Sequence, residues 1–179
     1  LAKQNDVLPV IYHHTVFTIP AELRTLFKYN KKLMYNLLFK CAWETIDSFS
    51  KDPRNRIEAK MGMIAILHTW KQDLDYHPHL HCIIPSGGIT TNNKWKSSPS
   101  NGDYLFNHEA LADVFKGKFL DYLKSYFEKN ELLFWDLKDI STADYFYLLK
   151  EDLYEKDWVV NTKKSFKTHD SVFEYLGRY

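Results

Sequence analysis

The stretch that most constrains the fold runs from Tyr76 to Pro85 and reads YHPHLHCIIP. Because residues two apart in a strand point to the same face, His79 and His81 would present two imidazoles side by side, and Leu80 would enter a core on the opposite face. Pro78 lacks an N–H and favours the start or edge of a strand, so we expect His77 to lie outside it. The stretch therefore predicts a sheet with histidines on one face and a covered core on the other.

The rest of the sequence predicts further strands and the helices that would cover this sheet. A β-rich run over 10–19 would place His14 on one face and His13 on the other. The apolar run 63–70 predicts a central strand that turns back to pair with the histidine strand as an antiparallel hairpin. Apolar or capping patterns predict helices at 21–27, 30–49, 107–126, 141–155 and 171–179, and a further strand at 158–162. This order predicts one α+β domain over 1–179, with a mainly antiparallel central sheet and helices packed on it.

Two sets of side chains carry the candidate chemistry. Two neutral imidazoles on a rigid sheet supply two-thirds of a metal site, which makes His79 and His81 the first candidate ligands. A His-x-His strand on its own is equally compatible with two half-buried polar residues. At the far end of the chain, Tyr175 and Tyr179 are four residues apart, so on a helix both phenols would share one face, about 5–6 Å apart at Cβ. A metal site combined with paired tyrosines is more specific than either feature alone.

Four ordered motifs resemble the HUH endonucleases, which cut single-stranded DNA through a tyrosine. More narrowly, they resemble the two-tyrosine transposases of the ninety-one family of rolling-circle insertion sequences. The resemblance runs from about Val10 to the last residue. Its motifs are Tyr12-His13-His14-Thr15-Val16-Phe17-Thr18-Ile19-Pro20, His68-Thr69-Trp70, His77-Pro78-His79-Leu80-His81 and Tyr175-Leu176-Gly177-Arg178-Tyr179. The resemblance implies a sheet of the ferredoxin or RRM-like kind.

The resemblance also implies a reaction. Tyr175 would attack a phosphodiester and form a 5′-phosphotyrosine link, and Tyr179 would accept a second strand in the next transfer. A Mg²⁺ or Mn²⁺ ion on His79 and His81 would hold the phosphate, with Gln72 of the neighbouring strand as the implied third ligand. The alternatives for this third position are Asp73, Asp75, His68 and His77.

The implied substrate is single-stranded DNA at transposon ends. Lys163 and Arg178 are candidate phosphate contacts, and His14 could approach either the metal or the DNA. A homodimer is compatible with this interpretation.

Composition limits the partners and the setting. Lys and Arg number 24 against 23 Asp and Glu, so DNA binding would depend on local clusters such as Lys31-Lys32 instead of a global basic field. No apolar run reaches membrane-spanning length and the first residues lack a signal-peptide core, which favours a cytoplasmic protein. Cys41 and Cys82 have no paired spacing that would indicate a disulfide or a thiolate zinc site. Since Leu1 is not an initiator methionine, we expect a fragment, and the resemblance implies a cysteine-rich zinc-binding segment before it and further chain after Tyr179.

Two other functions remain compatible with the sequence. A zinc hydrolase could use His77, His79 and His81 to activate water, and it would retain activity with phenylalanine at both 175 and 179. A non-catalytic DNA-binding relic would bind DNA but form no covalent adduct with any metal.

Overall fold

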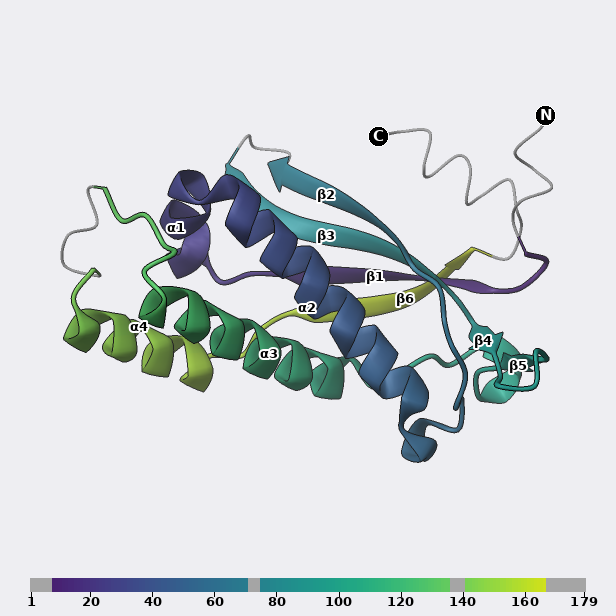
Figure 1. Cartoon of the computed structure of the whole chain (residues 1–179). Coiled ribbons are helices and arrows are strands. Elements are labelled where there is room, and N and C mark those ends of the chain that lie inside the picture. The colour runs from purple at the N-terminus through teal and green to yellow at the C-terminus, as the bar shows by residue number, and fades with distance from the viewer. Residues whose placement is uncertain (1–7, 71–74, 136–140, 167–179) are drawn as a thin grey trace.

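A four-stranded antiparallel sheet forms the centre of the molecule (Figure 1). The computed structural model describes residues 8–70, 75–135 and 141–166. The strands lie in the order β2-β3-β1-β6 and span Tyr12–Thr18 (β1), Ile64–Trp70 (β2), Tyr76–Pro85 (β3) and Val160–Phe166 (β6). The predicted α+β fold, with a mainly antiparallel sheet and helices packed on it, is confirmed.

Four α-helices accompany the sheet in the described part of the chain. They span Arg24–Tyr29 (α1), Lys31–Lys51 (α2), His108–Glu128 (α3) and Ala143–Glu155 (α4). A two-stranded ribbon of β4 (Gly87–Ile89) and β5 (Trp95–Ser97) follows β3, and short 3-10 turns occur at Ala21–Leu23, Pro53–Asn55 and Ser100–Gly102. Over the described ranges, no helix combines the length and apolar character needed to cross a bilayer.

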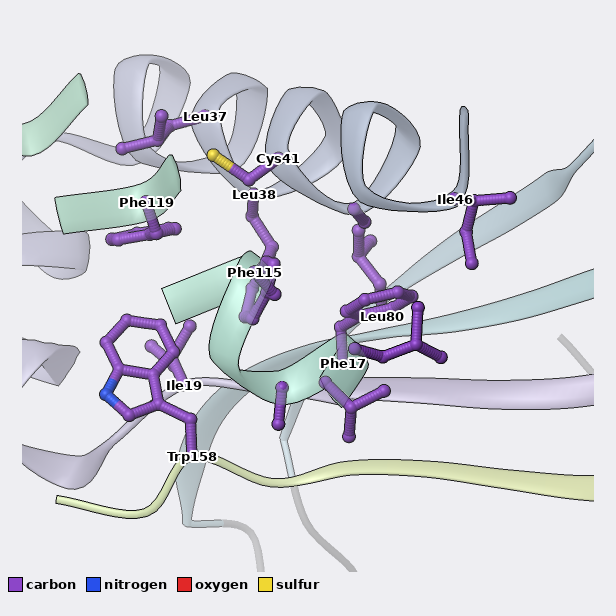
Figure 2. Close-up of a cluster of buried hydrophobic side chains, with 14 of the residues drawn as sticks. Phe17, Ile19, Leu37, Leu38, Cys41, Ile46, Leu80, Phe115, Phe119 and Trp158 are labelled. Atoms are coloured by element: carbon purple, nitrogen blue, oxygen red, sulfur yellow. The ribbon is translucent and has the colours of Figure 1, made fainter. Parts of the chain in front are cut away.

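The core lies between one face of the sheet and the helices α2 and α3 (Figures 1 and 2). Phe17 of β1 and Leu80 of β3 are fully buried there. The ring of Phe17 packs against Phe115 of α3 with centroids 5.0 Å apart. Asn107 caps α3 by accepting a hydrogen bond from the N–H of Ala110, as its sequence position predicts. This packing fixes which face of each strand is turned away from the core.

Along β1 and β3, residues that face the core alternate with residues on the other face of the sheet. In β1, His13, Thr15 and Phe17 are buried, whereas His14, Val16 and Thr18 are half-buried. In β3, Leu80 is buried between half-buried His79 and His81. His14, His79 and His81 therefore lie on the face opposite the core, whereas His13 lies on the core face, as the alternation predicts.

Two predicted strands have wrong bounds, and the second of them, expected over 158–162, spans Val160–Phe166. The histidine strand begins at Tyr76, before Pro78, so His77 lies inside β3. The pairing with β2 shifts register between His68 and Trp70, which accommodates the additional residue on β3 beside Pro78. The last strand begins at Val160, two residues later than expected, because Trp158 instead packs its ring against Phe119 of α3. The predicted helix 171–179 lies outside the described residues.

Candidate metal centre

Three histidines from two paired strands converge on the face opposite the core. His68 of β2 lies directly opposite His79 of β3, and His81 follows two residues later. One ring nitrogen from each lies within 4.8 Å of the other two. The ring centroids are 4.1 Å apart for His68 and His81, 4.9 Å for His79 and His81, and 5.3 Å for His68 and His79. We call these three residues the histidine triad.

The sheet pairing explains this convergence. Directly opposed residues of an antiparallel pair share a face, with Cβ atoms about 4.5–5.5 Å apart. The register pairs His68 with His79 and Ile66 with His81, so all three imidazoles project from one face of the β2–β3 hairpin. The triad is thus a direct consequence of hairpin register.

A backbone hydrogen bond fixes the tautomer of His79. Its Nδ1 lies 2.6 Å from the carbonyl oxygen of His77. Since a carbonyl can only accept, Nδ1 carries the proton, and the lone pair of a neutral ring is left on Nε2. This arrangement of one ring nitrogen on a carbonyl and the other directed to a metal is the usual one for histidine ligands.

His14 of β1 supports His81 in a similar way. Nε2 of His14 lies 2.8 Å from Nδ1 of His81, and the two rings stack at 4.9 Å. When Nε2 of His81 is a ligand, the proton of the neutral His81 ring is on Nδ1, so His81 donates and His14 accepts. His14 therefore orients the His81 ring through the nitrogen that does not bind the metal.

Burial and neighbouring imidazoles lower the pKa of two members of the triad, His68 and His81. Burial, followed by the neighbouring His68, His14 and His79, lowers the pKa of His81 to about 3. Burial, followed by His79, also lowers the pKa of His68. Neutral imidazoles are the form that binds metals, so these shifts favour ligation.

His77 is held outside the triad. Its Nδ1 lies 2.8 Å from the guanidinium Nη2 of Arg24, and its ring centroid is 5.5 Å from that of His79. Because arginine can only donate, this nitrogen of His77 is the acceptor, and its lone pair is engaged. The three histidines gathered here therefore differ from the set His77, His79 and His81 of the zinc-hydrolase alternative.

The structure brings together only part of the predicted site. His79 and His81 lie in the triad, His14 adjoins it, and exposed Lys163 of β6 lies opposite His14 in the register. In the described residues the third histidine is His68, which the sequence ranked behind Gln72. Four residues of the predicted site lie outside the described part of the chain: Gln72, Tyr175, Arg178 and Tyr179.

Sequence comparison assigns most of the chain to one family. The family described as "Putative transposase" (Y2_Tnp) matches residues 62–179. The "Putative transposase y4qJ" of Sinorhizobium fredii is 34% identical over 178 residues, covering 99% of this chain and 44% of that relative. The transposase for insertion sequence element IS801 of Pseudomonas savastanoi pv. phaseolicola is 29% identical, covering 100% of this chain and 41% of that relative. The chain thus spans less than half the length of the curated relatives it matches.

Solved structures show a distant similarity. The metal-free conjugative relaxase TrwC in complex with OriT DNA is 13% identical, with a TM-score of 0.41 over 64% of this chain and 44% of that chain. A copper-bound structure of the same relaxase with OriT DNA has a TM-score of 0.39.

Proposed function

Because the chain belongs to the Y2_Tnp transposase family, we propose that it cleaves and rejoins single-stranded DNA at transposon ends through a 5′-phosphotyrosine intermediate. The transposase for insertion sequence element IS801, which matches over the full length of this chain, supports this reaction class. The observation that carries the proposal is the histidine triad on the face of the sheet opposite the core.

The triad fits a divalent metal ion. His68, His79 and His81 would hold it: their ring nitrogens lie within 4.8 Å of one another, and a backbone carbonyl fixes the tautomer of His79. Three neutral nitrogen donors suit Mn²⁺ and the later transition metals better than Mg²⁺, which prefers oxygen. We therefore favour Mn²⁺ of the two ions that the sequence suggested. When bound, the ion would withdraw charge from the non-bridging oxygens of a phosphate.

Tyr175 is the proposed nucleophile. Its phenol oxygen would form a bond to phosphorus while the bond between phosphorus and the 3′-oxygen breaks. The phenol proton is lost to solvent, and the departing 3′-oxygen takes up a proton to become a hydroxyl. The link keeps the phosphodiester's energy, so a 3′-hydroxyl could reverse the step without a nucleotide cofactor, and Tyr179 could accept the second strand.

The side chains around the triad have supporting roles in this proposal. His14 would orient His81, and the main chain of His77 would orient His79. Exposed Lys163 lies opposite His14 in the register, where its charge could contact a phosphate of the bound strand. Arg178 remains a predicted phosphate contact.

The test is covalent capture of DNA. The chain is incubated with labelled single-stranded oligonucleotides from the ends of its own element and Mn²⁺, then denatured and separated by electrophoresis. We expect a denaturant-resistant adduct that disappears with His79→Ala and with the double change Tyr175→Phe and Tyr179→Phe. Cleavage that survives the double change would support the zinc-hydrolase alternative and overturn the proposal. Binding without an adduct under any metal would support the non-catalytic relic and would overturn it as well.

A further inference from the structure

A second cluster of side chains lies where the β2–β3 hairpin adjoins α1. Trp70 of β2 is 56% exposed, and its ring lies 5.5 Å from that of Tyr76 on β3 in an edge-to-face arrangement. Nζ of Lys28 on α1 lies 5.5 Å from the centre of the Tyr76 ring. We call Trp70, Tyr76 and Lys28 the hairpin corner. It combines the exposed indole of Trp70 with a cation–π contact between Lys28 and Tyr76.

The hairpin corner lies one register pair beyond the histidine triad, at the end of the hairpin. Trp70 pairs with Tyr76 in the register, next to the pair formed by His68 and His79. Two residues of strand cover about 7 Å, which is within the reach of a single nucleotide. Because Tyr76 contacts Tyr35 of α2, the corner faces the helix layer, so a strand whose phosphate lies at the triad would reach Trp70 by passing around the end of the hairpin.

Basic side chains outnumber acidic ones beside this corner, where the carboxylate of Asp75 lies 3.9 Å from Nη1 of Arg24. Residues 23–43 include five basic side chains and no acidic one, although the whole chain has a net charge of only +1. Lys28 lies in the last turn of α1, and Lys31 and Lys32 begin α2; all three are exposed. Such a local field is complementary to a polyanion.

Two hydrogen bonds tie the β3 side of the corner to the helices. The hydroxyl of Tyr76 hydrogen-bonds that of Tyr35 on α2 at 2.8 Å, which ties the hairpin to the helix layer. Arg24 of α1 bonds His77, the residue after Tyr76. A fixed aromatic surface next to basic side chains is the arrangement that binds single-stranded nucleic acid by base stacking and phosphate contact.

We propose that the hairpin corner binds the single strand of DNA beside the cleaved phosphate. Trp70 stacks on a base, while Lys28, Lys31 and Lys32 contact the backbone. The position next to the cleaved phosphate rests on the proposed function. The binding of a single strand can be measured without cleavage.

The test measures binding in the presence of EDTA, so that no metal-dependent reaction contributes. A fluorescein-labelled oligothymidylate of about 16 nucleotides is titrated with the chain, and its anisotropy is followed. Because one stacked base contributes about 1–3 kcal/mol, we expect Trp70→Ala to weaken binding about 5- to 150-fold and Trp70→Phe to restore most of it. The matched control is Tyr145→Ala on α4, which removes an aromatic ring that is also 56% exposed and should leave the affinity unchanged.

Salt dependence tests the basic side chains. Lys28→Ala should reduce the slope of log K against log salt by about 0.7, the value for one phosphate contact of a single strand. Lys94→Ala, which removes an exposed lysine before β5, should leave the slope unchanged. Equal affinity of Trp70→Ala and the unchanged chain would overturn the inference.

The outcomes also separate this inference from the proposed function. If covalent adducts form with the unchanged chain while Trp70→Ala binds and reacts equally well, the surface is wrong and the transposase proposal stands. If Trp70 governs oligothymidylate binding but no adduct forms with any metal, the surface stands as a binding site and the proposed cleavage is wrong.

Discussion

The hydrogen bond between His14 and His81 is expected to affect metal binding, and this role can be tested by substitution. If His81 binds a metal through Nε2, then His14 accepts its Nδ1 proton and fixes the ring. Loss of such a supporting group usually costs 10- to 100-fold in metal affinity. We expect His14→Ala to weaken Mn²⁺ binding by about this factor in isothermal titration calorimetry.

His77→Ala is the matched control for this measurement. It removes an imidazole beside the triad but keeps the backbone carbonyl that fixes the tautomer of His79. Affinity should therefore remain close to that of the unchanged chain. Equal losses from both substitutions would contradict the specific role of His14.

The lowered pKa of His81 predicts sensitivity to acid. In the unfolded chain this imidazole titrates near its ordinary pKa of 6.5, whereas in the metal-free fold its pKa is about 3. The unfolded state therefore binds more protons between these values, and stability falls as the pH is lowered through this range. Melting curves in EDTA should show a smaller fall between pH 6.5 and pH 4 for His81→Gln than for the unchanged chain. Parallel falls would contradict this assignment.

The histidine residues also show what the sequence could predict. The alternation His79-Leu80-His81 fixes which face each side chain takes, and the structure confirms it. His68 ranks behind Gln72 in the sequence because the resemblance implies an amide or carboxylate on the neighbouring strand. The place of His68 depends on the exact register of the hairpin, which shifts between His68 and Trp70. Counting back from His79 across an antiparallel pair is the signal that would have favoured His68.

At the scale of elements, β3 joins the site to the core. Leu80 is fully buried between the two histidines and packs with the core that α2 and α3 cover. Replacing a buried leucine by alanine usually costs about 2–5 kcal/mol. We expect Leu80→Ala to lower the free energy of unfolding by this amount in urea titrations, with Leu80→Met costing less than about 1.5 kcal/mol. A loss below 1 kcal/mol for alanine would contradict the tight packing described here.

Element types were easier to predict than element ends. The stripe over 30–49 and the apolar run 63–70 are long periodic signals, and they correspond to α2 and β2. The predicted start at Pro78 is wrong because the part of β3 before His79 pairs with β2 alone and the register shifts there, so a residue without an N–H is tolerated. The stretch 158–162 is predicted as a strand, but the indole of Trp158 packs on α3 and donates to the carbonyl of Leu153.

At the scale of the molecule, the proposed reaction requires Tyr175 to reach the triad. β6 ends at Phe166, which lies opposite Tyr12, whereas His81 lies opposite Val16. Four residues of strand separate these two rows, about 13 Å. Tyr175 follows Phe166 by nine residues (175 − 166), a length of chain that covers about 14 Å if it is fully helical and more if part of it is extended. The chain length therefore allows Tyr175 to return over the face opposite the core to the triad.

A paramagnetic distance measurement tests this geometry. A nitroxide is attached to Tyr175→Cys, and Mn²⁺ is added without DNA. Labelling should be selective, because Cys41 and Cys82 are buried and burial raises the pKa of both thiols, that of Cys41 to about 12. We expect Mn²⁺ to attenuate the nitroxide signal strongly, and we expect His68→Ala to remove the effect because it removes a ligand. A label at Tyr145→Cys on α4, on the helix side of the molecule (Figure 1), should respond weakly. If the two labels respond alike, residue 175 does not approach the triad within one molecule, and the tyrosine would have to come from a second copy of the chain.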